Sequence, residues 1–242
     1  MSHRPVVSWR LTHHALVLFD IDGTLVRRAG PHHRQALVYG VRRVTGLETT
    51  TDGIPVQGML DPDIVTAMMR RAGASRARIR EAMPAIHRAA ERYYLRVCPA
   101  LDGKHCPGVE PLLARLVRRG ILLGLVTGNL THIGWCKLER AGLRDYFRFG
   151  AFGEMAKTRA RLVKIAMAEA LRRRWIAGDA PVTLVGDAPS DVLAARNNRI
   201  RSIAVQTGIT PVEQLVSNRP DLLLRDLREL RLRMVEAPFV MI

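Results

Sequence analysis

Four apolar runs, each of which stops at polar or glycine residues, limit the possible folds of this chain more than anything else in its 242 residues. They lie at 15–19, 121–126, 182–185 and 203–205. Helix-period stretches stand between them, at 109–119, 131–141, 159–174 and 189–197. Continuous apolar runs are typical of strands buried on both faces, and strands that alternate with helices form parallel sheets. The sequence therefore predicts an α/β fold, with a Rossmann-like parallel sheet wrapped by helices on both faces.

Residues 27–106 interrupt this alternation, because they contain only helical patterns. These patterns cover 31–45, 61–71 and 75–97, and Pro84 predicts a kink or a restart in the third. Asp61-Pro62 is typical of an N-cap followed by proline at the first helical position. We therefore expect a discontinuous core, 15–26 and 107–242, with an inserted all-helical cap at 27–106 and an N-terminal extension at 1–14.

Polar side chains directly follow the predicted strands. Because ligands of an open parallel sheet bind beyond the carboxyl ends of its strands, these residues are expected to gather at one edge: Asp20, Asp22, Thr127, Gly128, Asn129, Asp187 and Asp191. Asp179 lies at the opposite end of the strand at 182–185 and is excluded. Four carboxylates in a small space repel one another unless a cation compensates them. Oxygen ligands favour Mg²⁺, which suits a phosphorylated substrate.

The chain is strongly basic, with 38 Lys and Arg against 22 Asp and Glu and a formal net charge of +16. Such an excess raises nucleic acid or an acidic membrane surface as partners. The cations are scattered, with no run longer than the three at 172–174, and only 5% of residues are aromatic, which disfavours nucleic-acid binding. Residues 27–106 carry 14 Lys and Arg against 7 Asp and Glu. A basic cap over an acidic, metal-holding site would instead concentrate anionic phosphate esters.

The apolar runs and the cysteines bear on location. The longest runs, 15–19 and 121–126, are far shorter than the roughly 20 residues of a membrane-spanning helix. The N-terminal residues lack the continuous apolar stretch of a secretory signal. Cys98, Cys106 and Cys136 form no C-x-x-C pair and are expected to be reduced and buried. The prediction is a cytoplasmic protein without membrane contact, either a monomer or a homodimer.

Three segments carry a resemblance to a known family through their order and spacing. They are Phe19-Asp-Ile-Asp-Gly-Thr-Leu25, Leu125-Val-Thr-Gly-Asn129 and Val185-Gly-Asp-Ala-Pro-Ser-Asp191. They resemble the motifs of the haloacid dehalogenase-like (HAD) hydrolase superfamily. The resemblance spans about residues 15–232 and includes Cys106-Pro-Gly-Val109 and Ala204-Val-Gln-Thr-Gly208. It looks most like the phosphoglycolate-phosphatase-like branch, whose helical cap is inserted just after the first motif, where residues 27–106 lie.

The resemblance implies a phosphoric monoester hydrolase and a role for each matched residue. Asp20 would be the nucleophile that takes the phosphoryl group as an aspartyl phosphate. Asp22 would protonate the leaving oxygen and later activate water. Mg²⁺ would be held by Asp20, the backbone carbonyl of Asp22, and Asp187, with Asp191 as a ligand or as a neighbour of the ligands. Phosphate oxygens would be held by Thr127 and by the amides of Gly128 and Asn129.

The family's basic residue is the least certain match. It is usually a lysine followed by proline, just before the helix that leads to the last motif. This chain has Lys157-Thr-Arg159 in that region without the proline, and Lys164 lies further into the predicted helix. Alignment of the apolar positions Leu162 and Ile165 with the family's helix favours Lys157, with Arg159 as the alternative and Lys164 third.

Other activities compete with a phosphatase. A dehalogenase needs neither Mg²⁺ nor the second aspartate, so the presence of Asp22 argues against it. A phosphonate-cleaving relative needs a cap lysine, and residues 27–106 offer only Lys104, at the hinge. A phosphomutase stays open, because transfer to a sugar hydroxyl instead of water depends on cap closure. From a different class, the charge of +16 suggests a non-enzymatic binder of RNA or another polyanion on the same scaffold.

Cap residues supply substrate specificity in enzymes of this type. The loop Gly58-Met-Leu-Asp61 precedes a predicted helix whose N-terminus is expected to face the site, so the candidate specificity residues are Gly58, Leu60 and Asp61. Substitution of Leu60 or Asp61 is expected to change substrate preference more than hydrolysis of a generic ester. Lys137 and Trp135 are expected to serve the surface or packing.

Overall fold

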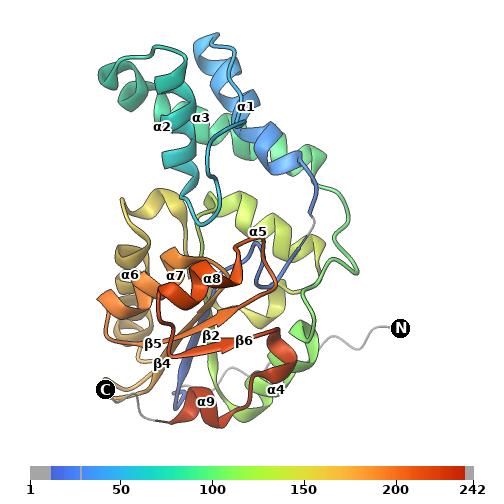
Figure 1. Ribbon diagram of the computed structural model, residues 1–242, viewed down its shortest axis with the longest axis vertical. Coiled ribbons are helices and arrows are strands. Elements are labelled where there is room, and N and C mark those ends of the chain that lie inside the picture. Colours follow the sequence, from blue (N-terminus) through green and yellow to red (C-terminus); the bar gives the residue numbers. More distant parts are fainter. Residues whose placement is uncertain (1–11, 28, 238–242) are drawn as a thin grey trace.

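The sheet predicted from the apolar runs is present in a computed structural model of the chain, which describes residues 12–27 and 29–237. Within these residues, parallel strands form one sheet in the order β3-β2-β1-β4-β5-β6 (Figure 1). The strands are β1 (Leu16–Phe19), β2 (Leu122–Val126), β3 (Phe149–Ala151), β4 (Val182–Gly186), β5 (Arg201–Val205) and β6 (Leu222–Leu224). The predicted α/β fold is therefore confirmed.

The four predicted strands correspond to β1, β2, β4 and β5. The sequence analysis missed β3 and β6, which have three residues each and lie at the two edges of the sheet. An edge strand of three residues is too short to show a period, and it is held mainly by pairing with its neighbour. These two strands extend the sheet without changing its topology.

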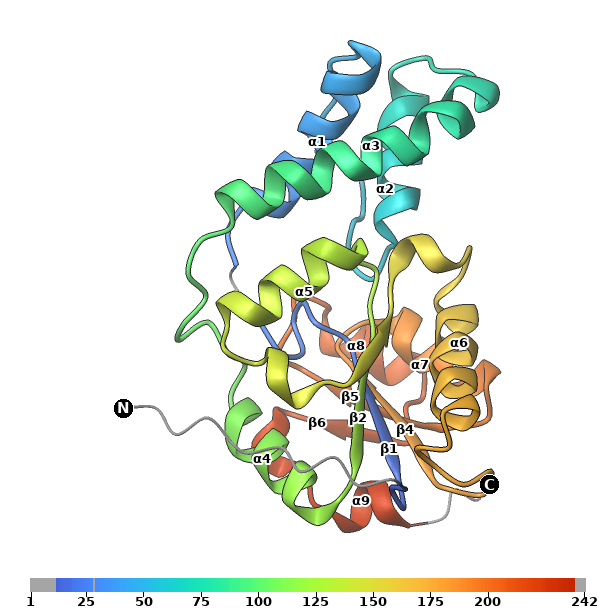
Figure 2. The ribbon, with the colours of Figure 1, turned by 180° about the vertical axis from the view of Figure 1, so that it is seen from behind.

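Helices cover both faces of the sheet, and β1 shows why. Val17 and Phe19 belong to a core cluster with α4 (Val109–Arg119), α5 (Thr131–Arg140) and α9 (Arg233–Glu236). Leu16 and Leu18 belong to a second cluster with α6 (Arg159–Arg172) and α7 (Pro189–Asn197). Successive side chains of a strand point to opposite faces, so a continuous apolar strand joins two layers of helices (Figure 2). Short elements complete the core: α8 (Val212–Ser217), η1 (Arg144–Tyr146), η2 (Gly153–Met155) and η3 (Leu227–Glu229).

Three helices, α1 (His32–Thr45), α2 (Asp61–Arg71) and α3 (Arg76–Val97), stand apart from the sheet beyond α5 (Figures 1 and 2). We call these helices, with the segments that join them to one another and to the core (27–106), the cap. α1 packs closely on α3, because a Cβ at Gly40 would come within 2.8 Å of the carbonyl oxygen of Ile86. α3 runs through Pro84 as one helix, so the predicted restart is absent. Two antiparallel segments link cap and core, where Val26 pairs with His105.

Three expectations about the ends and the thiols can be compared with the structure. No helix among the described residues is both long enough and apolar enough to cross a membrane. Most of the extension expected at 1–14 lies outside the described residues. Cys98, Cys106 and Cys136 are all buried and free, as expected.

Candidate active site

The register of the central strands brings the three sequence motifs to one edge of the sheet. Phe19, the last residue of β1, lies opposite Leu125 of β2 and opposite Val185 of β4. The residues that follow each strand therefore emerge side by side. Asp179 precedes β4 and is exposed, so it lies away from this edge. The expected gathering of the motif residues is present.

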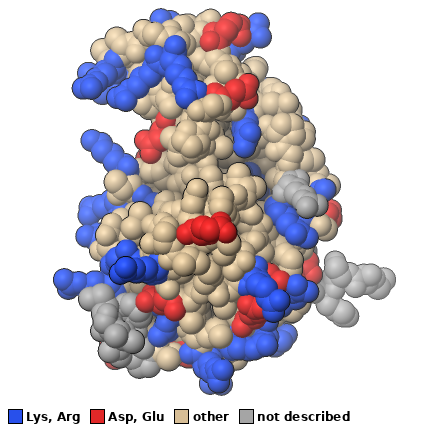
Figure 3. All heavy atoms as spheres, in the orientation of Figure 1, with Lys and Arg blue, Asp and Glu red and all other residues tan. Residues whose placement is uncertain are grey.

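A cavity of about 450 Å³ opens above this edge, between the core and the cap. Its floor carries the motif residues Asp20, Asp22, Thr127, Gly128, Asn129 and Asp187. The cap contributes Arg27, His33, Arg34, Val56, Gln57, Gly58, Met59 and Asp61 among its lining residues. An acidic floor thus faces a cap with two arginines. The cap is basic as a whole, and Figure 3 shows its Lys and Arg side chains in separate groups with Asp and Glu between them.

Three of the predicted acids form one buried cluster. Oxygens of Asp20, Asp187 and Asp191 all lie within 4.8 Å of one another, and each residue is at most 5% exposed. Burial raises the pKa of Asp187 well above its usual range, and the neighbouring charges of Asp20 and Asp191 raise it further. Burial also raises the pKa of Asp191 to about 7, although a nearby arginine opposes the shift. The cluster therefore holds more negative charge than the protein itself compensates.

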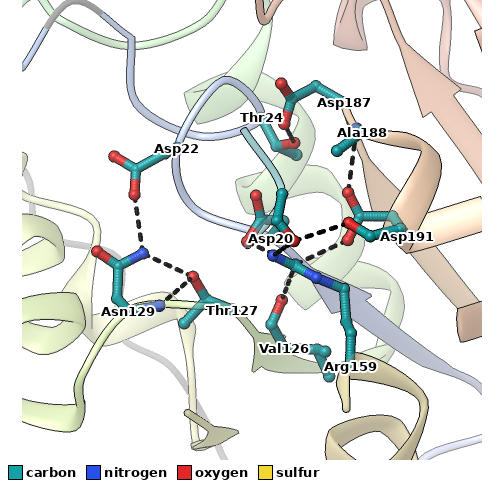
Figure 4. A network of polar contacts seen from close by, with 12 residues as sticks. Asp20, Asp22, Thr24, Val126, Thr127, Asn129, Arg159, Asp187, Ala188 and Asp191 are labelled. Atoms are coloured by element: carbon teal, nitrogen blue, oxygen red, sulfur yellow. Dashed lines mark hydrogen bonds and ion pairs between the residues drawn. The ribbon is translucent and has the colours of Figure 1, made fainter. Parts of the chain in front are cut away.

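The compensating cation that the protein supplies is Arg159, the first residue of α6 (Figure 4). Its Nη1 donates to Asp191 Oδ1 at 2.8 Å and to Asp20 Oδ1 at 3.1 Å, and the residue is buried. Burial lowers the pKa of Arg159, but the two carboxylates outweigh burial and the net pKa is raised. Lys157, the residue favoured from the sequence, is exposed, and so is Lys164. Of the three basic candidates, the structure brings Arg159 alone to the acids.

The alignment pointed to Lys157 because it counted from apolar positions within the helix. In the structure Thr158 is the N-cap of α6 and its side chain accepts from the amide of Arg161. Arg159 is then the first helical residue, and its long side chain points toward the cluster (Figure 4). Lys157 precedes the N-cap residue Thr158 and lies at the surface.

Asp22 lies on the other side of Asp20, in a separate network (Figure 4). Its carboxylate accepts from Asn129 Nδ2 at 2.8 Å and from Lys137 Nζ at 2.6 and 2.7 Å. Partial burial raises the pKa of Asp22, but the charge of Lys137 and the hydrogen bonds from Lys137 and Asn129 outweigh it, so the net pKa is lowered. Asp22 is therefore held as a carboxylate at the cavity wall.

Lys137 was expected at the surface or in packing, but it is buried at the cavity and contacts Asp22. The residue is 1% exposed, lies on the buried face of α5 and lines the cavity. A signal was present in the sequence: Lys137 follows the apolar Ile133 by four residues, which places both on one helix face. A lysine on an apolar face calls for buried acceptors.

The loop after β2, which carries the residues predicted to bind phosphate, packs closely against the cap loop. Thr127 is fully buried and its hydroxyl accepts from Asn129 Nδ2 at 2.7 Å. The carbonyl of Gly128 accepts from the amide of Asp61 at 2.8 Å. A Cβ at Gly128 would lie 2.1 Å from the carbonyl oxygen of Met59. Only glycine allows the cap loop to come this close.

The cap loop before α2 reaches directly into the acid cluster. Gln57 Nε2 donates to Asp187 Oδ2 at 2.6 Å, and Ser190 Oγ donates to the carbonyl of Gly58 at 3.1 Å. Gly58 has φ of 68°, and a Cβ there would lie 2.5 Å from Ser190 Oγ, so glycine is required for two reasons. Gln57 was not named from the sequence. An amide side chain in a loop gives no periodic signal by which to find it.

The other two specificity candidates differ in their surroundings. Leu60 is 4% exposed and packs in the core cluster beneath α6, outside the cavity lining. Asp61 lines the cavity, but its Oδ2 accepts from the amide of Leu130 at 2.8 Å. Leu60 occupies the N-cap position of α2, so Asp61 is not the N-cap that the sequence suggested. The carboxylate of Asp61 fastens the cap to the core instead.

The acid cluster has the donor set of a Mg²⁺ site. Its three carboxylates are buried, supply only oxygen, and are close enough to share one ion. Thr24 Oγ1 and Gln57 Nε2 each donate to one oxygen of Asp187, which orients that carboxylate. Burial and the neighbouring carboxylates raise the pKa values of Asp187 and Asp191, and a divalent cation would offset this crowding of negative charge. The residues therefore fit the metal that the sequence predicted.

Comparisons with known proteins agree with this geometry. A phosphoglycolate phosphatase of Agrobacterium fabrum is 30% identical over 222 residues, which cover 87% of this chain and 88% of that protein. A phosphoglycolate phosphatase of Synechococcus elongatus is 35% identical over 118 residues, 49% of this chain and 53% of that protein, so this match spans about half of the relative. CbbY of Rhodobacter sphaeroides, solved with xylulose-(1,5)bisphosphate, shares the fold with a TM-score of 0.70 at 19% identity over 93% of this chain and 100% of that chain.

The model of one family covers most of the chain. The haloacid dehalogenase-like hydrolase family matches residues 14–198, which include β1, the cap, and the strands and loops that carry all the motif residues. This chain belongs to the haloacid dehalogenase-like hydrolase family.

Proposed function

We propose that this protein is a Mg²⁺-dependent phosphatase that hydrolyses a small phosphorylated metabolite through an aspartyl phosphate on Asp20. The observation that carries the proposal is the pairing of two groups beneath one cavity. Asp20 lies in the acid cluster with Arg159, and Asp22 lies beside it in a separate hydrogen-bond network. A nucleophile and an acid-base group with different surroundings are what a two-step phosphoryl transfer needs.

In the first step, a carboxylate oxygen of Asp20 attacks the phosphorus and the ester oxygen leaves. Asp22, a carboxylate in the free protein, takes up a proton as the anionic ester enters the cavity, gives this proton to the leaving oxygen and becomes a carboxylate again. In the second step, water attacks the phosphorus of the aspartyl phosphate while Asp22 takes a proton from the water. Asp20 is released as a carboxylate with inorganic phosphate, and Asp22 returns to its protonated form. Both steps use the same two residues in the roles that the family resemblance implies.

Other residues hold the groups in place. The hydroxyl of Thr127 and the amides of Gly128 and Asn129 are suited to bind the non-bridging phosphoryl oxygens. Arg159 orients Asp20 through the hydrogen bond at 3.1 Å. Asp20, Asp187 and Asp191, with the backbone carbonyl of Asp22, would hold Mg²⁺, whose charge neutralises the negative charge that spreads over the transferring phosphoryl group.

The alternatives gain less support. Asp22 is built into a network of Asn129 and Lys137, which a dehalogenase would not need. A polyanion binder would require a continuous basic surface, whereas the face in Figure 3 carries basic and acidic groups in turn. The buried free cysteines support the cytoplasmic location expected from the sequence.

A screen of phosphorylated metabolites tests the proposal. The protein is incubated with each ester and Mg²⁺, and released phosphate is measured for the wild type and for Asp20→Asn. We expect one or a few small esters to be hydrolysed well, p-nitrophenyl phosphate to be hydrolysed slowly, and both activities to be lost in EDTA and in the variant. Phosphate release that Asp20→Asn leaves unchanged would reject the proposal, and transfer of the phosphoryl group to a second sugar hydroxyl would identify a mutase.

A further inference from the structure

The side chain of Lys137 has more acceptors than a surface or packing role would explain. It is 1% exposed, and its ammonium donates to both oxygens of Asp22 at 2.6 and 2.7 Å and to Asn129 Oδ1 at 2.6 Å. A buried ammonium is costly unless such acceptors surround it. Lys137 also lies 3.1 Å from Nδ1 of His33, which belongs to the cap.

The contact between Lys137 and His33 determines which nitrogen of the imidazole carries the proton. An ammonium has only donors, so Nδ1 of His33 must accept the hydrogen bond from Lys137. The proton of the neutral ring then lies on Nε2, which donates to Asp61 Oδ2 at 2.9 Å. The same Asp61 oxygen accepts from the backbone amide of Leu130, in the core, at 2.8 Å.

These contacts form one chain that leaves the core and returns to it. It runs from Asp22 to Lys137 in the core, then to His33 on α1 and Asp61 on α2 in the cap, and ends at Leu130 in the core. Two of its members belong to the cap and would move with it. The position of Lys137 is therefore complete only when the cap is docked as it is here.

We propose that Lys137 is a positioning residue that holds Asp22 in place, and that His33 and Asp61 make this hold depend on the docked cap. The inference rests on the proposed phosphatase function, because it assigns Asp22 its proton-transfer role. Its consequence is that proton transfer to the leaving group is assembled when the cap covers a substrate. An uncovered site keeps the Asp22–Lys137 contact but loses His33 from it, so Asp22 is less restrained there.

The kinetic test uses leaving groups of different quality. A general acid matters most for ethyl phosphate, whose alkoxide leaves poorly, and least for p-nitrophenyl phosphate, whose phenolate leaves well. We expect Lys137→Met to lower kcat/KM for ethyl phosphate about tenfold more than for p-nitrophenyl phosphate. Lys137→Arg, which keeps the charge, should recover part of the loss. Arg140→Met on the same helix is the matched control, because Arg140 is exposed, and both values should stay near those of the wild type.

A double-variant cycle asks whether Lys137 acts through Asp22. In an Asp22→Asn background, Lys137→Met should lower kcat/KM for ethyl phosphate by less than about twofold, against about tenfold or more in the wild-type background, because the partner is already lost. Equal losses for both esters, or the same loss in both backgrounds, would overturn the inference while leaving the phosphatase proposal intact. His33→Leu tests the cap end without emptying the Lys137 position, and a smaller loss of the same kind is expected from it.

A measurement that needs no activity tests the geometry itself. The ¹⁵N chemical shifts of the His33 ring in the whole protein should show a protonated Nε2 and an unprotonated, hydrogen-bonded Nδ1. Lys137→Met should move the Nδ1 resonance, and Arg140→Met should not. A proton on Nδ1 in the wild type would overturn the chain of contacts, whatever the enzyme hydrolyses.

Discussion

Arg159 donates from Nη1 to Asp191 Oδ1 at 2.8 Å, so the first residue of α6 forms a buried ion pair with the first turn of α7. The same nitrogen also contacts Asp20. One guanidinium thus joins the proposed nucleophile to a proposed metal ligand. A single positive charge faces three carboxylates, so a metal ion can still bind to balance the remaining negative charge. The hydrogen bond from Arg159 meanwhile keeps the carboxylate of Asp20 in place.

The contacts of Arg159 predict a large effect of its removal. Arg159→Met should lower kcat for phosphate esters on the order of 100-fold, because Asp20 loses its orienting donor and the cluster loses the guanidinium that contacts it. Lys157→Met is the matched control. Its side chain is exposed, and the change should stay within about twofold. Steady-state kinetics of the two variants decide between these residues, and a larger loss in Lys157→Met would contradict the site as described.

The raised pKa of Asp191 predicts how the metal-free protein responds to pH. With a pKa of about 7 in the folded state and an ordinary value of 3.8, the folded protein binds the extra proton between these values. The stabilisation from that proton is complete below about pH 4 and is lost as pH rises through 7. In EDTA, the melting temperature of Asp191→Asn relative to the wild type should therefore increase from pH 5 to pH 8. A constant difference between the two proteins would contradict the assignment.

Mg²⁺ should reverse this trend in the wild type. Binding needs the ionised carboxylates, so the shift in melting temperature caused by Mg²⁺ should grow from pH 5 to pH 8. At one hundred times the dissociation constant, the stabilisation amounts to about 2.7 kcal/mol. Scanning calorimetry with and without Mg²⁺ measures it, and Asp191→Asn should show a smaller shift. An equal shift in both proteins would place the metal elsewhere.

The cap arginines predict a preference for substrates with a second anionic group. Arg34 lines the cavity and forms no ion pair with an acid among the described residues. Arg34→Gln should lower kcat/KM for phosphoglycolate about tenfold or more, since a charged hydrogen bond contributes about 1.5 kcal/mol or more. The value for p-nitrophenyl phosphate should change little. Arg43→Gln, on the exposed side of the same helix, serves as control. Equal losses on both esters would count against a role in selectivity.

The three thiols are predicted to be inert in the folded protein. Burial raises the pKa of Cys106 to about 11 and, together with the neighbouring Cys98, that of Cys136 to about 12. At pH 8, about one thiol in a thousand is ionised at Cys106. Iodoacetamide should therefore label none of the three within the time that labels all of them in guanidinium, as mass spectrometry would show. Rapid labelling of the native protein would mean that these thiols are open to solvent.

The fold was largely predictable because the same sequence pattern, an apolar strand followed by a helix, recurs along the chain. β1, β2, β4 and β5 are each continuous apolar runs that stop at polar residues, and the helices between them keep one period. The cap helices α1 and α3 begin one residue later than predicted. The predictions that failed concern local features. The short edge strands β3 and β6 were missed, and the N-cap of α2 was misplaced because the backbone amide of Leu130 binds the carboxylate of Asp61.

The site was predictable where residues follow strands and unpredictable where contacts cross between elements. Asp20, Thr127 and Asp187 lie together because the sheet register aligns them. No sequence rule decides between Lys157 and Arg159, two residues apart, until the N-cap of α6 is known. Gln57 reaches the site across the boundary of cap and core, and Lys137 reaches it from α5 of the core; such packing is set by the whole fold.

The most direct measurement is the detection of the covalent intermediate. The protein is mixed with a good substrate and Mg²⁺, quenched in acid during turnover, and digested for mass spectrometry. The account predicts one phosphoryl group on the peptide that contains Asp20, absent in Asp20→Asn and in EDTA. Turnover of the same substrate by Asp20→Asn, or sustained turnover with no phosphoryl group on that peptide, would contradict it.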